Sequence, residues 1–129
     1  MINKIESKLN ELEYSHIINN SGRVHEYVKA HLVIMADDFG CIGVPEVRIP
    51  VAGKRSGEGR IDVVWYKSGV EVAGFEIEPT YKVNSIEKLI QLPKQAHRVI
   101  VSIHPDEKYI NERITDLPSN IVPIKAGVG

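Results

Sequence analysis

The chain has 129 residues, of which 43% are hydrophobic and 26% charged, and this is the ordinary composition of a globular domain. The composition excludes a disordered or collagen-like chain, and a single cysteine excludes an internal disulfide framework. The formal net charge of −1 argues at first against nucleic acid as a partner, because nucleic-acid-binding domains usually carry a strongly basic surface. We therefore expect one globular domain spanning residues 1–129.

The N-terminal part of the sequence has helical periodicity. Apolar residues at spacings of three and four predict one helix over residues 3–17 and a second over residues 23–37. No apolar run approaches the ~18 residues of a membrane span, and the N-terminus lacks the apolar region of a signal peptide. We therefore expect a cytoplasmic protein without a membrane partner.

The middle and the end of the sequence combine strands with two more helices. Strands are predicted at residues 44–49, 60–66, 70–78, 97–103 and 121–124. Helices are predicted at residues 84–92 and 105–114, the first with a capping-box-like start and stopped by Pro93. Both faces of such a sheet need cover, because its strands are flanked by helices with apolar faces. The predicted fold class is α/β, with a mixed central β-sheet flanked by helices on both faces.

The two strands at residues 60–66 and 70–78 are predicted to form a hairpin. A three-residue connection ending in Gly69 fits a turn closed by a left-handed glycine. With Tyr66 opposite Val70, Asp62 faces Gly74 and is a diagonal neighbour of Glu76, roughly 7–8 Å away at the backbone. Side-chain alternation then separates two faces of the hairpin. One face holds Asp62, Val64, Val72, Gly74, Glu76 and Glu78, and the other holds Ile61, Val63, Trp65, Ala73, Phe75 and Ile77.

Three carboxylates on one face of apolar strands need a compensating partner, because buried unpaired carboxylates cost several kcal/mol each. A hard divalent cation such as Mg²⁺ or Mn²⁺ accepts carboxylate oxygens and keeps several waters. Gly74 beside Asp62 is expected to leave open space for such an ion. The alternative is that the strands lie at a sheet edge, with the acids solvated or paired with basic residues. The candidate basic partners are Arg60, Lys82 and Arg98.

These motifs resemble the PD-(D/E)xK nuclease superfamily, whose restriction-endonuclease-like fold also occurs in archaeal Holliday-junction resolvases. The resemblance lies in Gly59-Arg60-Ile61-Asp62-Val63-Val64 and Gly74-Phe75-Glu76-Ile77-Glu78, followed by a helix and an apolar strand. It covers residues 22–104, with residues 1–20 as an N-terminal helix and residues 105–129 as a C-terminal decoration.

The resemblance implies a divalent-metal-dependent DNA endonuclease with Mg²⁺ or Mn²⁺ as cofactor. The metal-binding acids would be Asp62 and Glu76, and Glu78 stands where the family usually has a lysine. Glu78 would then be a third ligand or a base, or Lys82 would take the place of the lysine. The family's further acid on the first core helix would fall on Glu26, with Glu46 as the alternative.

The resemblance also implies DNA, duplex or branched, as the substrate, and a homodimer that presents two centres to it. Lys54, Arg55 and Arg60 would contact phosphates beside the site. Metal held by the acids would offset their charge, so near-neutrality predicts weak DNA binding without metal. The alternative function is a catalytically inactive nucleic-acid-binding or assembly protein that has lost the lysine.

A zinc site on the second helix is not expected. His25 and His31 are six residues apart, whereas the histidines of a helical zinc motif are four apart and share a face.

Overall fold

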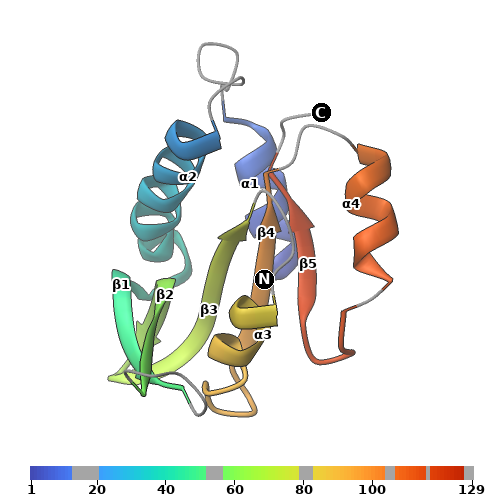
Figure 1. Cartoon of the computed structure of the whole chain (residues 1–129). Helices are drawn as coiled ribbons and strands as arrows, with labels where there is room; N and C mark the ends of the chain where they lie inside the picture. Colours follow the sequence, from blue (N-terminus) through green and yellow to red (C-terminus); the bar gives the residue numbers. More distant parts are fainter. Residues whose placement is uncertain (13–20, 52–56, 79–82, 104–106, 116, 127–129) are drawn as a thin grey trace.

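The computed structural model describes residues 1–12, 21–51, 57–78, 83–103, 107–115 and 117–126. Figure 1 shows a central sheet with helices packed around it. The elements in chain order are α1 (Ile2–Asn10), α2 (Ser21–Met35), the 3₁₀ helix η1 (Ala36–Phe39), β1 (Ile42–Pro50), β2 (Glu58–Lys67), β3 (Val70–Glu78), α3 (Val83–Leu89), β4 (His97–Ser102), α4 (Glu107–Ile114) and β5 (Val122–Lys125). This order of helices and strands is the predicted one, with η1 added at the end of α2.

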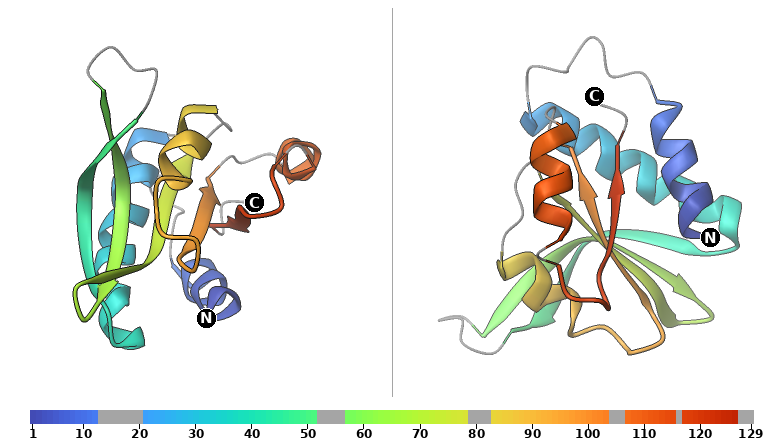
Figure 2. Two further views of the ribbon diagram at one scale, coloured as in Figure 1. Left: turned by 90° about the horizontal axis from the view of Figure 1, so that it is seen from below. Right: turned by 90° about the vertical axis from the view of Figure 1, so that its right-hand side faces the viewer.

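The five strands form one mixed sheet in the order β1-β2-β3-β4-β5. The pairs β1/β2 and β2/β3 are antiparallel, and the pairs β3/β4 and β4/β5 are parallel. In Figure 2, α1 and α2 lie on one side of the sheet, and α3 and α4 lie on the other. The prediction of an α/β fold with a mixed sheet is confirmed.

Two hydrophobic clusters fill the two sides of the sheet. The larger cluster joins α1 and α2 to alternate residues of the central strands, and Trp65 at its centre donates an indole hydrogen bond to the carbonyl of Leu32. The smaller cluster packs Leu89 of α3 and the nearby Leu92 against Ile61, Val64 and Ile100. Helix α1 and strand β5, from opposite ends of the described chain, pack together in the larger cluster. The Glu6 carboxylate of α1 also accepts a hydrogen bond from the Lys125 amide of β5.

The β2–β3 hairpin has a different register from the predicted one. Its turn contains only two residues, Ser68 and Gly69, and both have positive φ (51° and 77°), as a type I′ turn requires. A β-bulge follows, because Trp65 pairs with Ala73 whereas Tyr66 pairs with Glu71. The shorter turn and the bulge each shift the pairing by one residue. Because the total shift is two residues, most of the hairpin residues still lie on their predicted face.

Three predicted placements on the hairpin are wrong. Gly74 lies opposite Val64, and a Cβ there would overlap Leu92, so the missing side chain accommodates α3-side packing and leaves no open space beside Asp62. Ile61 packs in the smaller cluster with Val64, and Val72 packs against the larger one. The reasons are the bulge beside Val72 and the break in alternation at Asp62.

Candidate functional site

Asp62 and Glu76 meet where β2 and β3 separate. The hairpin ladder reaches Val63 and Phe75 as its last pair. Beyond that pair, the Asp62 amide donates to Glu76 Oε2 at 2.9 Å, and the Ile77 amide donates to Asp62 Oδ2 at 2.8 Å. Each carboxylate thus accepts a hydrogen bond from a main-chain amide of the other strand. Because the ladder pairs Val63 with Phe75, the register carries Asp62 toward Glu76 and not toward the predicted Gly74.

Burial and hydrogen bonding shift the pKa values of the two acids in opposite directions. Glu76 is fully buried, and burial together with the negative charge of Asp62 raises the pKa of its carboxyl group to about 7, although Lys88 opposes this rise. Burial acts in the same direction on Asp62, but hydrogen bonds from His25 and from the Ile77 amide outweigh it. The pKa of Asp62 is therefore lowered. At neutral pH, Asp62 is an anion beside a partly protonated Glu76.

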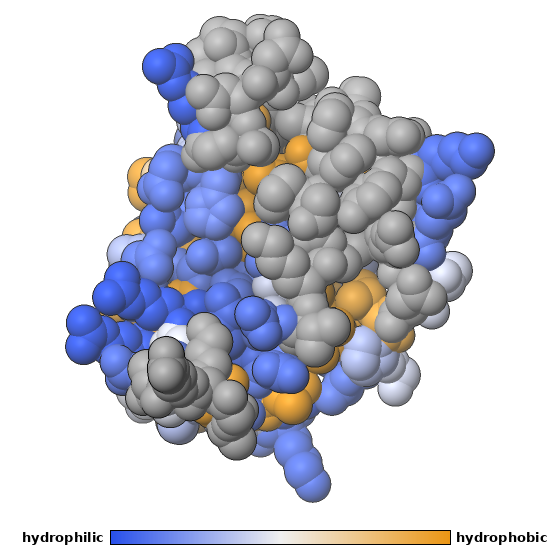
Figure 3. All heavy atoms as spheres, viewed as in Figure 1, coloured by the Kyte–Doolittle hydropathy of each residue, from blue (hydrophilic) through white to orange (hydrophobic). Residues whose placement is uncertain are grey.

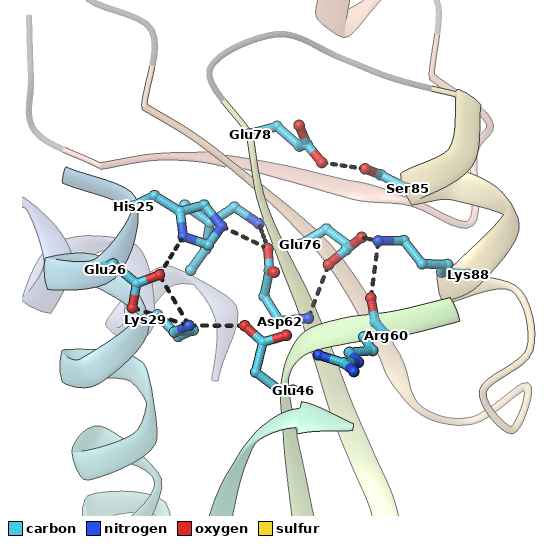
Figure 4. Close-up of polar contacts among 11 residues, drawn as sticks. His25, Glu26, Lys29, Glu46, Arg60, Asp62, Glu76, Glu78, Ser85 and Lys88 are labelled. Atoms are coloured by element: carbon cyan, nitrogen blue, oxygen red, sulfur yellow. Dashed lines mark hydrogen bonds and ion pairs between the residues drawn. The ribbon is translucent and has the colours of Figure 1, made fainter. Parts of the chain in front are cut away.

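Lys88 of α3 supplies the cation next to Glu76. Its ammonium forms an ion pair with Glu76 Oε1 and donates to the Arg60 carbonyl at 2.9 Å. Gly59 makes this approach possible, because a Cβ there would lie only 3.1 Å from the Lys88 stem. Glu76 Oε1 is buried, and its contact among the described residues is this ion pair with Lys88. Figure 4 shows Lys88 reaching Glu76 from the side opposite His25.

His25 of α2 contacts Asp62 from the other side. Its Nε2 lies 3.2 Å from Asp62 Oδ2, and its Nδ1 lies 3.6 Å from Glu26 Oε1. The hydrogen bond with Asp62 raises the pKa of His25 despite its partial burial. Sequence reasoning assigned no role to either His25 or Lys88. The available signal for His25 was its place beside Glu26 on the first core helix, where the resemblance implies a site residue.

Glu26 and Glu46 belong to a neighbouring group of ion pairs around Lys29. The Lys29 ammonium lies 3.0 Å from Glu26 and 2.8 Å from Glu46. The hydrogen bond from Lys29 lowers the pKa of the Glu26 carboxyl group. In the described structure, neither acid contacts Asp62 or Glu76 directly, and Glu26 is linked to Asp62 only through His25. Glu46 has a positive φ of 54° on β1, where the chain passes Asp62 on the neighbouring strand.

Glu78 points toward α3 and is not brought together with Asp62 and Glu76. Its buried carboxylate accepts a hydrogen bond from the buried Ser85 hydroxyl (Figure 4). The remaining predicted residues Lys54, Arg55 and Lys82 lie outside the described residues.

Arg60 is exposed and lies directly opposite Arg48, which is also exposed, in the β1–β2 ladder. Two like charges facing each other across strands are unfavourable. Among the residues that the structure describes, neither guanidinium has a carboxylate partner. Figure 3 shows hydrophilic residues gathered over α2 and over the neighbouring strands β1 and β2. The ladder therefore places two positive charges side by side on this surface.

The described residues contain no group of three or more His, Cys, Asp or Glu side chains arranged to hold a metal ion. Asp62 and Glu76 are the only two predicted metal ligands that contact each other within this part of the chain. No described helix is both long enough and apolar enough to cross a membrane.

We compared the chain with protein-family models, with curated proteins and with solved structures, and none of the three comparisons gives a match.

Proposed function

We propose that the protein is a Mg²⁺- or Mn²⁺-dependent DNA endonuclease of the PD-(D/E)xK type. The observation that carries the proposal is the constellation of Asp62 and Glu76 on opposed strands with the Lys88 ammonium on Glu76. The order α2, β1, β2, β3, α3, β4 also agrees with the family's core of a helix, three strands, a helix and a strand. The cation that the family usually carries two residues after its second acid comes here from α3.

Two carboxylates are enough protein ligands for a magnesium ion. Mg²⁺ keeps several waters and is usually bound by one or two carboxylates together with substrate phosphates. Glu76 Oε1 is a buried oxygen in contact with the Lys88 ammonium, so a bound ion would share the Glu76 carboxylate with this lysine. Asp62 and Glu76 would hold the ion, which would lower the pKa of a bound water and neutralise charge on the scissile phosphate.

Three other residues have roles that their contacts support. Lys88 would orient the attacking water and stabilise negative charge on the phosphate, because its ammonium lies at the Glu76 carboxylate. His25 would hold the Asp62 carboxylate in place through its Nε2 contact of 3.2 Å. Arg48 and Arg60 would bind a backbone phosphate of the DNA, since an anion between them removes their mutual repulsion.

Cleavage of supercoiled and branched DNA in the presence of Mg²⁺ or Mn²⁺ tests this function. We expect cleavage by the wild-type chain and a loss of at least about a hundredfold in Asp62→Asn, Glu76→Gln and Lys88→Met. Asp37→Asn and Lys94→Met are matched controls, because both side chains are exposed and make no described contact. Full cleavage by Lys88→Met would contradict the role given to that lysine. The predicted homodimer is checked separately by sedimentation.

A catalytically inactive nucleic-acid-binding protein is the second candidate function. The observation in its favour is that protein groups already engage both acids: His25 and the Ile77 amide on Asp62, and Lys88 and the Asp62 amide on Glu76. This function predicts metal-independent DNA binding and no cleavage by the wild-type chain.

A further inference from the structure

The second carboxylate of the Glu-x-Glu strand contacts helix α3. Glu78 is 9% exposed and Ser85 is 1% exposed, and the Ser85 hydroxyl donates to Glu78 Oε1. One turn later on the same helix, Lys88 contacts Glu76 Oε1. Two carboxylates of β3 therefore hold α3 at two points, and the second point is the candidate site itself.

The spacing of these residues makes the two contacts compatible. Ser85 and Lys88 are three apart and share a face of α3, with a rise along the helix of about 4.5 Å. Glu76 and Glu78 are two apart and share a face of β3, with a rise of about 6.6 Å. The long Lys88 side chain spans the difference, because its stem lies over Gly59.

The apolar contacts of α3 hold it against the sheet but are not directional. The helix has seven residues, and a helix this short has no stability of its own in water. Leu89 and Ile86 hold it against the smaller cluster, but apolar packing has no direction, so it tolerates a shift along the strand. The Glu78–Ser85 hydrogen bond is directional and buried, and it therefore sets the register of the helix on the strand.

We propose that Glu78 is a positioning residue, which binds Ser85 and so fixes α3 where the Lys88 ammonium reaches Glu76. The inference rests on the proposed function only for the role of Lys88 in cleavage. It replaces the reading of Glu78 as a third metal ligand or a base.

The accessibility of Lys88 tests this positioning without any cleavage assay. The measurement is the rate at which an amine-acylating ester modifies Lys88 in the metal-free protein, followed by peptide mass spectrometry. We expect Glu78→Ala and Ser85→Ala each to raise this rate about tenfold. The factor corresponds to the free energy of one hydrogen bond to a charged acceptor, which both variants lose. Because both substitutions break one contact, the double variant should add little to either single variant.

Two further variants separate positioning from simple loss of folding. Glu78→Gln keeps an acceptor oxygen for Ser85, so we expect labelling close to that of wild type. Asn84→Ala changes an exposed neighbour on α3 and should also leave the rate unchanged. Glu78→Gln and Asn84→Ala remain informative if Glu78→Ala does not fold.

Cleavage measured over a range of Mg²⁺ concentrations up to saturation completes the test. We expect Ser85→Ala to lower kcat as Glu78→Ala does, with Glu78→Gln close to wild type. A normal Ser85→Ala variant alongside a Glu78→Gln variant that needs more Mg²⁺ would overturn the inference and make Glu78 a metal ligand. If the wild-type chain cleaves nothing while the labelling pattern holds, the nuclease function fails and the positioning role stands.

Discussion

Glu76 is a buried carboxyl group whose charge changes with pH near neutrality. Its pKa of about 7 in the folded chain lies above the ordinary value of 4.5, because burial and the Asp62 charge disfavour the anion. Between these two values, the folded chain holds a proton that the unfolded chain has released. The free energy of unfolding therefore falls as the pH rises through this interval. His25 acts in the same direction, since its raised pKa gives stability below pH 6.5 that is lost as the pH rises through the folded value.

We predict that the metal-free protein is more stable at pH 5 than at pH 8, by about 2 to 3 kcal/mol from Glu76 alone. Urea unfolding at several pH values measures the difference. Glu76→Gln removes the titrating group, so the remaining slope should be small and should come from His25. An unchanged slope in this variant would show that the burial of Glu76 does not control the pH dependence.

At the scale of the elements, periodicity predicted most of the structure but not the residues that complete the site. Every helix and strand was found in the predicted order, because each element carries its own alternation or helical stripe. Asp62 and Glu76 were found together because the error in register was an even number of residues. His25 and Lys88 were missed, because the position of a helix on a sheet depends on packing between distant segments. Gly59 and Leu92 take part in that packing, and no local sequence pattern reveals such a contact.

Gly74 illustrates the packing that joins α3 to the sheet. Its backbone lies under Leu92, and a Cβ would overlap that side chain. We predict that Gly74→Ala destabilises the protein by about 1 to 3 kcal/mol, because the closely packed cluster has to shift. Urea unfolding checks this value, and Ala73→Gly on the opposite face shows the ordinary effect of exchanging glycine and alanine in this strand. A Gly74→Ala variant as stable as wild type would mean that Leu92 has room to move.

The proposed phosphate contacts of Arg48 and Arg60 predict how strongly DNA binding depends on salt. The logarithm of the binding constant falls linearly with the logarithm of the salt concentration. Each phosphate contact that is lost makes this slope less steep by about 0.9 for duplex DNA. We therefore expect Arg48→Gln and Arg60→Gln each to lower the slope by about one and to weaken binding of all sequences equally. Lys94→Gln is the control for the loss of one exposed positive charge. Equal slopes in the wild type and the three variants would show that neither arginine contacts DNA phosphates.

For the whole molecule, the net charge of −1 does not show how the charges are placed, and the ladder of β1 and β2 sets Arg48 directly opposite Arg60. In the proposed function, the charge of Asp62 opposes DNA binding until a divalent cation offsets it, whereas Arg48 and Arg60 favour binding. We predict weak binding of DNA without a divalent cation and at least about tenfold tighter binding with Ca²⁺, which takes the same oxygen ligands. Fluorescence anisotropy with a labelled duplex measures both states. Asp62→Asn should abolish the effect of Ca²⁺, and an effect that survives this substitution would place the cation elsewhere.

The direct test of the site is a crystal structure of the protein grown with Mn²⁺, with anomalous scattering recorded at the manganese edge. We predict a manganese peak bonded to carboxylate oxygens of both Asp62 and Glu76, with the Lys88 ammonium beside Glu76 and Glu78 still on Ser85. The absence of a peak at these acids, with His25 and Lys88 retaining their contacts to them at saturating Mn²⁺, would contradict it.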